Sequence, residues 1–116
     1  MSGTVPGAES VRRLAAALVE RVGSRNLRWV GPPLGDDVDA IGWRLTSAPR
    51  YLFSVSTHAG QLPVGWYDLQ VSISDNTLEN GEIVFLDEVG LQEACELARR
   101  YDRGDVVERF GGSGDA

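Results

Sequence analysis

Hydrophobic and polar residues alternate most regularly within residues 66–89. The first half of this stretch is apolar on one side and polar on the other, with Tyr67, Leu69, Val71 and Ile73 set against Asp68, Gln70, Ser72 and Ser74. A polar segment that ends in Asn80 and Gly81 follows, and residues 82–89 are a second run rich in strand-forming residues. Together they predict an antiparallel hairpin with one face in the core and the other in water.

Three other segments are predicted to be strands of the same sheet. Residues 40–46 and 51–57 alternate like the hairpin, and residues 26–30 form a shorter candidate strand that ends before a Gly-Pro-Pro turn. The apolar positions of the two alternating segments are Ile41, Trp43, Leu45, Tyr51, Phe53 and Val55. Because each strand is apolar on one side only, the other face of the sheet is expected to be open to water. That face would carry Arg44 and Ser54 beside the polar side of the hairpin.

Two segments have the spacing of amphipathic helices. Residues 8–22 place apolar side chains at helical intervals, namely Val11, Leu14, Ala15, Leu18 and Val22. Residues 91–101 repeat this pattern, with acidic residues early and arginines late, which is the order that the helix dipole favours. Gly23 and Gly104 follow the two segments at positions where a glycine commonly ends a helix.

These elements predict an α+β domain. We expect an antiparallel four- to five-stranded meander sheet, with an N-terminal and a C-terminal helix packed on one face. Residues 9–110 are predicted to form a single domain, residues 1–8 a disordered leader and residues 111–116 a disordered tail. Residues 106–110 are expected to be either a short edge strand or a docked tail.

The net charge of −6 is unevenly spread along the 116 residues. Residues 31–98 carry two Arg and eleven acidic residues, a net charge of −9, whereas residues 1–30 have a net charge of +3. An acidic surface argues against a nucleic-acid partner and favours encounter with a basic protein partner, although the same charge also serves solubility.

Nothing in the sequence points to a membrane or to secretion. No apolar run approaches the roughly 20 residues that span a bilayer. Residues 1–9 lack the basic start and apolar centre of a signal peptide. A single cysteine, Cys95, excludes an internal disulfide. The prediction is a cytoplasmic protein with no membrane partner.

Few residues suggest catalysis or metal binding. The only histidine, His58, follows a predicted strand, a position suited to a general base, but neither an orienting acid nor a nucleophile elbow accompanies it in the sequence. Residues 37–42 place two acids and a glycine at the EF-hand spacing, but Ile41 stands where a third ligand is needed. Cys95 falls on the apolar side of the second helix, as a structural thiol does. We therefore expect no enzyme activity, no metal and no cofactor.

Protein binding is the function that these features favour. Trp66 precedes the alternating strand and has the opposite parity to Tyr67, so its ring is either exposed as a binding anchor or packed under residues 58–65. Acidic residues lie in the expected loops and on the water-exposed side of the hairpin. The predicted partner-binding residues are Asp36, Asp37, Asp39, Trp66, Asp68, Asp75 and Glu79.

The layout resembles the Imm1-like group of immunity proteins, which neutralise deaminase and nuclease toxins of bacterial polymorphic toxin systems. The similar parts are residues 11–22, 43–85, 87–94 and 99–105, in that order. The tryptophan often found near the end of that group is absent, and Phe110 lies in that region. The resemblance implies a protein without catalytic residues that blocks a toxin sterically, with acidic loops and exposed aromatic residues in a basic active-site cleft.

Two other functions stay open. A secretion chaperone is also small, acidic and α+β, but it would be a dimer that binds an unfolded effector segment, whereas an immunity protein would bind a folded toxin as a monomer. A small enzyme built around His58 would need a pocket that joins this imidazole to a carboxylate, and an isolated exposed imidazole would count against it. Monomer and homodimer are both compatible with the sequence.

Overall fold

The computed structural model describes residues 7–30, 40–58, 60–73 and 82–108. Over these ranges the chain forms a helix, a run of strands and a second helix, in the predicted order. The elements are α1 (Ala8–Arg21), a 3₁₀ turn η1 (Ser24–Asn26), β1 (Leu27–Val30), β2 (Ala40–Leu45), β3 (Ala48–Ser56), β4 (Trp66–Ile73), β5 (Glu82–Gly90) and α2 (Leu91–Asp102).

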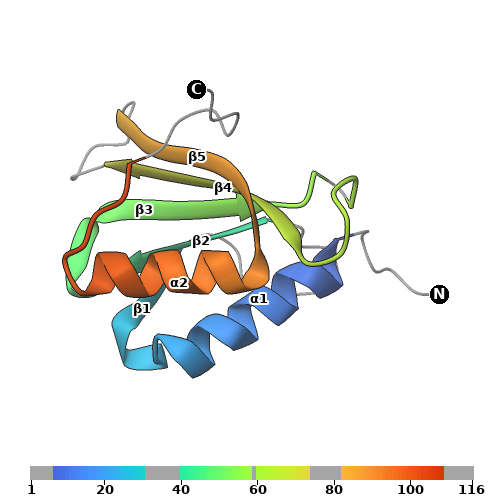
Figure 1. The fold of residues 1–116 in the computed structure, drawn as a ribbon. Coiled ribbons are helices and arrows are strands. Elements are labelled where there is room, and N and C mark those ends of the chain that lie inside the picture. The colour runs from blue at the N-terminus through green and yellow to red at the C-terminus, as the bar shows by residue number, and fades with distance from the viewer. Residues whose placement is uncertain (1–6, 31–39, 59, 74–81, 109–116) are drawn as a thin grey trace.

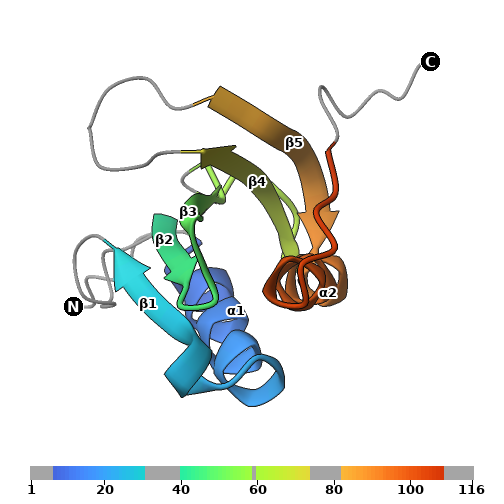
Figure 2. The same cartoon turned by 90° about the vertical axis from the view of Figure 1, so that its left-hand side faces the viewer.

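The strands form one antiparallel sheet in the order β1-β2-β3-β4-β5, so that each strand pairs with its neighbour in the sequence. Figures 1 and 2 show α1 and α2 side by side against one face of this twisted sheet. The helices bury their apolar sides against that face, as their periodicity requires. The predicted fold class, an open α+β meander with an N-terminal and a C-terminal helix, is confirmed.

The core lies between the helices and the sheet. Three of the four predicted inward residues of β4 are completely buried, since Tyr67, Leu69 and Val71 are each 0% exposed, and the fourth, Ile73, is half-buried. Trp43 of β2 is also 0% exposed and stacks on Phe53 of β3, with ring centroids 5.2 Å apart and planes 11° from parallel. The Phe53 ring in turn meets the edge of Tyr101 of α2 at 5.1 Å. This aromatic contact joins the middle of the sheet to the second helix.

The strand β5 departs from simple alternation. Val84 and Phe85 are neighbours in the sequence, yet both are buried. The register between β4 and β5 shifts here, from the pair Val71–Phe85 to the pair Ser72–Ile83. One additional residue on β5 is a β-bulge, which turns the following side chains to the other face of the strand.

The segment after α2 is a docked tail over the part that the structure describes. Residues 105–108 form neither helix nor strand. The Tyr101 hydroxyl donates a hydrogen bond to the carbonyl of Val107, and the half-buried Val107 side chain packs on the core. The alternative of an edge strand is therefore wrong for residues 106–108, and residues 109 and 110 lie outside the described residues.

The start of α1 packs tightly on the loop that follows β3. Gly7 precedes the helix with φ of +95°, and an added Cβ would lie 1.9 Å from Oγ1 of Thr57. Thr57 is 1% exposed, and its Oγ1 accepts a hydrogen bond from the amide of Gly60. The predicted loop of residues 58–65 therefore begins as a packed structure under α1. Of the predicted leader, residues 1–6 lie outside the described residues, as does the predicted tail of residues 111–116.

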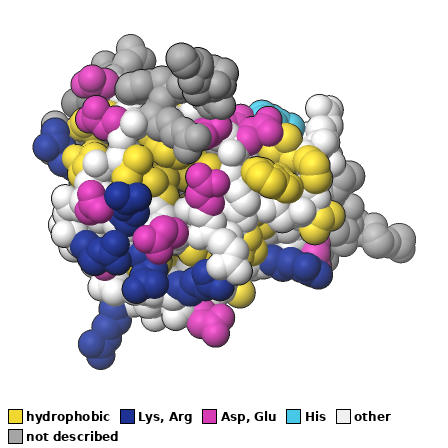
Figure 3. Space-filling view, viewed as in Figure 1, with side chains coloured by type: hydrophobic (Ala, Val, Ile, Leu, Met, Phe, Trp, Pro, Cys, Tyr) yellow, Lys and Arg dark blue, Asp and Glu magenta, His cyan; other side chains and the backbone are white. Residues whose placement is uncertain are grey.

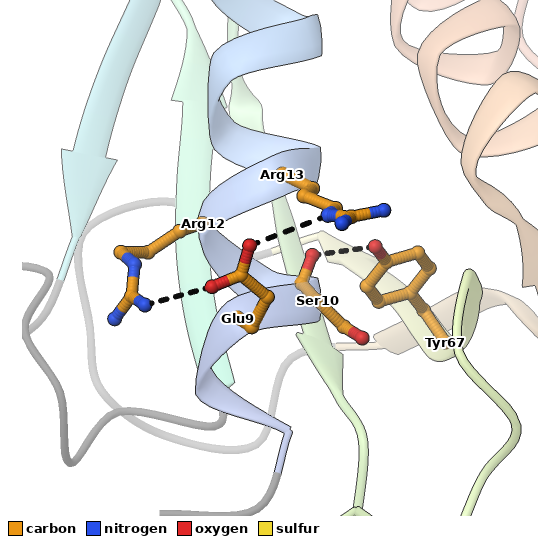
Figure 4. Close-up of polar contacts among 5 residues, drawn as sticks. All are labelled: Glu9, Ser10, Arg12, Arg13 and Tyr67. Atoms are coloured by element: carbon orange, nitrogen blue, oxygen red, sulfur yellow. Dashed lines mark hydrogen bonds and ion pairs between the residues drawn. The ribbon is translucent and has the colours of Figure 1, made fainter. Parts of the chain in front are cut away.

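A buried hydrogen bond ties α1 to the sheet. Figure 4 shows the Tyr67 hydroxyl of β4 donating to the main-chain carbonyl of Ser10, at 2.5 Å. On the outer side of the same helical turn, Glu9 accepts hydrogen bonds from Arg12 at 3.1 Å and from Arg13 at 3.4 Å. These exposed pairs contribute little free energy, roughly 0.3–0.5 kcal/mol each. The contact between Tyr67 and Ser10 is buried, and it adds a polar link to the apolar packing of α1 on the sheet.

The two buried tyrosines predict loss of stability in alkali. Burial raises the pKa of Tyr67 and of Tyr101 from 10.0 to about 12. The folded chain therefore retains phenolic protons that the unfolded chain loses above pH 10. The stability that the neutral phenols contribute is fully present below pH 10, and it is lost as the pH rises towards 12. The slope is about 1.4 kcal/mol per pH unit for each tyrosine.

Urea denaturation at a series of pH values between 10 and 12 measures this slope. Tyr67→Phe and Tyr101→Phe are each expected to lower the total slope by about 1.4 kcal/mol per pH unit, because each variant removes one titrating phenol. The buried thiol of Cys95, whose pKa is also raised, contributes to the slope of the parent chain and of both variants alike. A slope that both variants leave unchanged would assign the alkaline transition to other groups.

None of the helices in the described part of the chain is both long enough and apolar enough to cross a membrane.

Candidate functional site

We call the sheet face opposite α1 and α2 the open face, because none of the described helices or strands packs on it (Figure 2). Strand pairing arranges its side chains in rows that run across the strands. The first row is Ala40, Ser56, Asp68 and Glu88; the second is Val30, Gly42, Ser54, Gln70 and Leu86; the third is Arg28, Arg44, Leu52, Ser72 and Ile83. The predicted polar side of β4 lies on this face, together with Arg44 and Ser54, as expected.

A hollow of about 390 Å³ lies in the middle of the open face. Its position follows from the rows, because four neighbouring positions on β2 and β3 carry small side chains: Ala40, Gly42, Ser54 and Ser56. Larger residues on the neighbouring strands and in the next row form the walls. The hollow is lined by Val30, Ala40, Ile41, Gly42, Leu52, Ser54, Val55, Ser56, Asp68 and Gln70. Its floor therefore consists of small side chains, and its polar groups stand on β3 (Ser54 and Ser56) and on β4 (Asp68 and Gln70).

An imidazole and a carboxylate meet at the edge of this hollow. Nε2 of His58 lies 2.8 Å from Oδ2 of Asp68, and the two side chains are 51% and 33% exposed. Asp68 belongs to the lining of the hollow, whereas His58 follows β3 just outside it. The carboxylate that the sequence did not supply next to His58 is thus brought there by the sheet.

Local backbone geometry explains why the two side chains meet. Ser56, the last residue of β3, pairs with Asp68 on β4, so the residue two positions later lies close to the Asp68 carboxylate. His58 has φ of +53°, and its amide donates a hydrogen bond to Oγ of Ser56 at 3.0 Å. Histidine is one of the residues that enter this left-handed region more readily than most. The tight turn directs the imidazole back towards the sheet.

Several polar atoms of the hollow have unused hydrogen-bonding capacity. Within the residues that the structure describes, the side chains of Ser54 and Gln70 make no hydrogen bond, and Asp68 uses Oδ2 but not Oδ1. All three side chains are half-buried on the open face. Half-buried acceptors without a protein partner are suited to bind water or a ligand group that donates hydrogen bonds.

Trp66 lies on the same face at the start of β4. It is two residues before Asp68 in the strand and pairs with Gly90, and its side chain is 45% exposed. Of the two alternatives that the sequence left open, partial exposure on the open face is the one observed. Val64 nearby in the chain is 75% exposed, so apolar surface continues beyond the strand.

Charge is distributed differently on the two sides of the molecule. Figure 3 shows arginine side chains gathered over the lower part of the molecule, where α1 and α2 lie, with acidic side chains between them. In the same view the only histidine lies at the upper edge beside acidic and hydrophobic side chains. On the open face, the first row carries Asp68 and Glu88, and the third row carries Arg28 and Arg44. The β4 side of the hollow is therefore its acidic side.

The structure describes two of the seven predicted partner-binding residues. Trp66 and Asp68 lie on the same face of β4, beside the hollow. The other five, Asp36, Asp37, Asp39, Asp75 and Glu79, lie outside the described residues.

Sequence reasoning missed the pairing of His58 with Asp68 and the hollow itself. Both depend on the register between strands, which alternation within one strand does not determine. The sequence pattern makes no prediction for the exposure of Trp29. Its register places it beside Trp43 on the core side, with ring centroids 6.2 Å apart, but β1 is an edge strand and leaves the ring 42% exposed.

No metal centre is found in the described residues, because they contain no group of three or more His, Cys, Asp and Glu side chains suited to hold a metal ion. Cys95 is completely buried, and burial raises the pKa of its thiol above the ordinary value. A buried protonated thiol reacts slowly. This agrees with a structural role for Cys95.

The fold and the hollow together define a class: a small two-layer α+β protein with one open sheet face. Comparisons with protein-family models, with curated proteins and with solved structures give no match.

Proposed function

We propose that this chain is a small acidic cytoplasmic binding protein, most concretely an immunity protein that neutralises a toxin by covering its basic active-site cleft. The open face is the observation that carries the proposal. It combines an exposed aromatic ring, Trp66, with a hollow that has Asp68 in its wall. Aromatic anchors next to a pocket are the usual centre of a protein interface.

The charge of the chain supports a basic partner. The net charge is −6, and the acidic excess belongs to residues 31–98, which contain β2–β5. A cleft that binds a nucleic-acid substrate is basic, because it must neutralise phosphates. An acidic protein would be steered to such a cleft and would compete with the substrate there. Monomer and homodimer are both compatible with this proposal.

Charge reversal on the open face tests the proposal. Asp68→Lys is expected to weaken partner binding about 10- to 100-fold, because it places a cation against a basic surface and removes the pairing with His58. Glu20→Lys makes the same change of charge on the exposed outer side of α1. This control should change affinity less than about threefold, as long-range steering alone is affected.

The partner to use is the product of the neighbouring reading frame. Growth of cells that express this product, with and without each variant of the present chain, measures neutralisation, and calorimetry on the purified pair measures affinity. Equal losses from Asp68→Lys and Glu20→Lys would place the interface elsewhere. A dimer that binds an unfolded segment of the partner, seen by size-exclusion chromatography and limited proteolysis, would instead favour a secretion chaperone.

A second candidate function is a small enzyme that uses His58 as a general base. The observation that favours it is the 2.8 Å contact between His58 and Asp68 beside the hollow, which is the carboxylate partner that such a base needs. Oγ of Ser56 accepts a hydrogen bond from the His58 amide, and within the described residues it makes none with the imidazole, so the base would act on water or substrate directly. His58→Gln would abolish catalysis, whereas the glutamine amide can still donate a hydrogen bond to Asp68 and so preserve partner binding, which separates the two functions.

A further inference from the structure

We propose that the hollow of the open face is an anchor pocket for one arginine side chain of the partner. The inference rests on the proposed binding function and adds the chemical group that is recognised. Three properties of the hollow support it: a floor of small side chains, side-chain oxygens of Ser54 and Gln70 that are free to accept hydrogen bonds within the described residues, and the carboxylate of Asp68.

The floor suits a planar group. Gly42 has no side chain, and its neighbours Ala40 and Ser54 extend little above the sheet. A guanidinium is planar and weakly hydrated, so it lies against a flat, partly apolar surface at low cost in solvation. The aliphatic part of an arginine side chain would pass over Val30 or Leu52, which form apolar walls.

The acceptors suit a group that only donates. Asp68 has one carboxylate oxygen that is not used within the described residues, and Gln70 and Ser54 make no side-chain hydrogen bond there. Arginine offers five N–H donors in a fixed fork and has no acceptor. A guanidinium between Asp68 and Gln70 would satisfy several of these oxygens at once, and lysine would satisfy fewer because its ammonium is a point charge.

The charges around the hollow favour a cation at its β4 side. Among the described residues that line the hollow, Asp68 is the charged one, and Glu88 is its neighbour in the same row. Arg44 lies one row beyond the hollow, and its guanidinium donates a hydrogen bond to the carbonyl of Pro49 at 2.8 Å. His58 contacts Oδ2 of Asp68, which restrains the carboxylate and leaves Oδ1 without a partner in the described residues.

The experiment is a titration of the ¹⁵N-labelled full chain with N-acetyl-arginine methylamide, followed by amide chemical shifts. The neutral isostere N-acetyl-citrulline methylamide and the lysine analogue are titrated in parallel. We expect saturable shifts centred on Gly42, Ser54 and Gln70, with a dissociation constant on the order of millimolar, as a single side-chain contact gives. The citrulline and lysine probes should bind at least about tenfold more weakly, which corresponds to about 1.4 kcal/mol.

Two variants make the result specific to the hollow. Ser54→Leu fills the floor, and Asp68→Asn removes the charge while it keeps the shape. Each should weaken binding of the arginine probe about tenfold or more. Ser24→Leu, the same substitution at the exposed 3₁₀ turn η1, should leave the binding unchanged.

The outcomes are decisive in both directions. Shifts outside the open face, or equal affinity for arginine, lysine and citrulline probes, would overturn the inference. Its failure also differs from failure of the proposed function. A partner that still loses affinity with Asp68→Lys would support docking on the open face without an arginine anchor. A pocket that binds the arginine probe while no partner docks would support the pocket alone.

Discussion

Replacement of Phe53 by alanine is expected to lower the free energy of unfolding by about 3–5 kcal/mol. The ring is completely buried, stacks on Trp43 at 5.2 Å and meets the edge of Tyr101 at 5.1 Å. Its loss leaves a cavity between the sheet and α2 that neither aromatic neighbour can fill without moving. Domains of this size have roughly 5–15 kcal/mol of stability, so this loss is a large fraction of the total free energy of unfolding. Chemical denaturation followed by circular dichroism measures the change.

Leu52→Ala is the matched control for this variant. Leu52 is the preceding residue of β3, and it points to the open face, where it is half-buried. The cost there should be below about 1.5 kcal/mol, because little apolar contact is lost on an open face. Equal costs at the two positions would mean that the open face is buried in the folded chain.

Gly7→Ala is expected to be the most damaging substitution of comparable size. A methyl group at this position would lie 1.9 Å from Oγ1 of Thr57 and 3.1 Å from the amide nitrogen of Gly60. Its φ of +95° adds a further strain of about 1–2 kcal/mol for any residue with a Cβ. Overpacking adds about 1–3 kcal/mol, because Thr57 is buried and its hydroxyl is already held by Gly60. Thermal and urea denaturation measure the total.

Gly104→Ala is the control that separates backbone strain at positive φ from the steric clash with Thr57. Gly104 has φ of +88°, but an added Cβ would meet no described atom within 4 Å. It should therefore cost only the strain, about 1–2 kcal/mol. The difference between the two glycine variants gives the energy of the contact with Thr57. Similar losses of unfolding free energy at Gly7 and Gly104 would show that the turn at Thr57 rearranges to accommodate the added methyl group.

The fold was predictable because local patterns and topology agree. Each helix has an apolar side at helical spacing, and short links between antiparallel strands leave a meander as the simple arrangement. The exceptions have local causes. The bulge at Val84 breaks the alternation of β5, and β3 begins at Ala48, ahead of the residues that alternate clearly.

The candidate site was predictable only in part. Trp66 and Asp68 are two residues apart in one strand, so both side chains lie on the same face. The alternation within β4 alone is enough to predict this, without the pairing of β4 to another strand. The pairing of Asp68 with His58 and the hollow between Val30 and Gln70 require the register of three strand pairs at once. The pattern within one strand does not determine that register. If a strand shifted by one residue against its partner, each of its side chains would have different cross-strand neighbours.

The small residues in the middle of the open face have a consequence for how this chain can vary. Glycine, alanine and serine suit a strand less well than valine, isoleucine or threonine, so residues 40, 42, 54 and 56 occupy the centre of the sheet at some loss of stability. Packing does not require small side chains at all of them. An added Cβ at Gly42 would lie 3.2 Å from the carbonyl oxygen of Phe53, but Ala40 is exposed and the two serines are only half-buried. Selection for stability alone would thus favour larger, β-branched residues at Ala40, Ser54 and Ser56. Small side chains would be retained there only if selection also acted to keep the floor of the hollow unfilled.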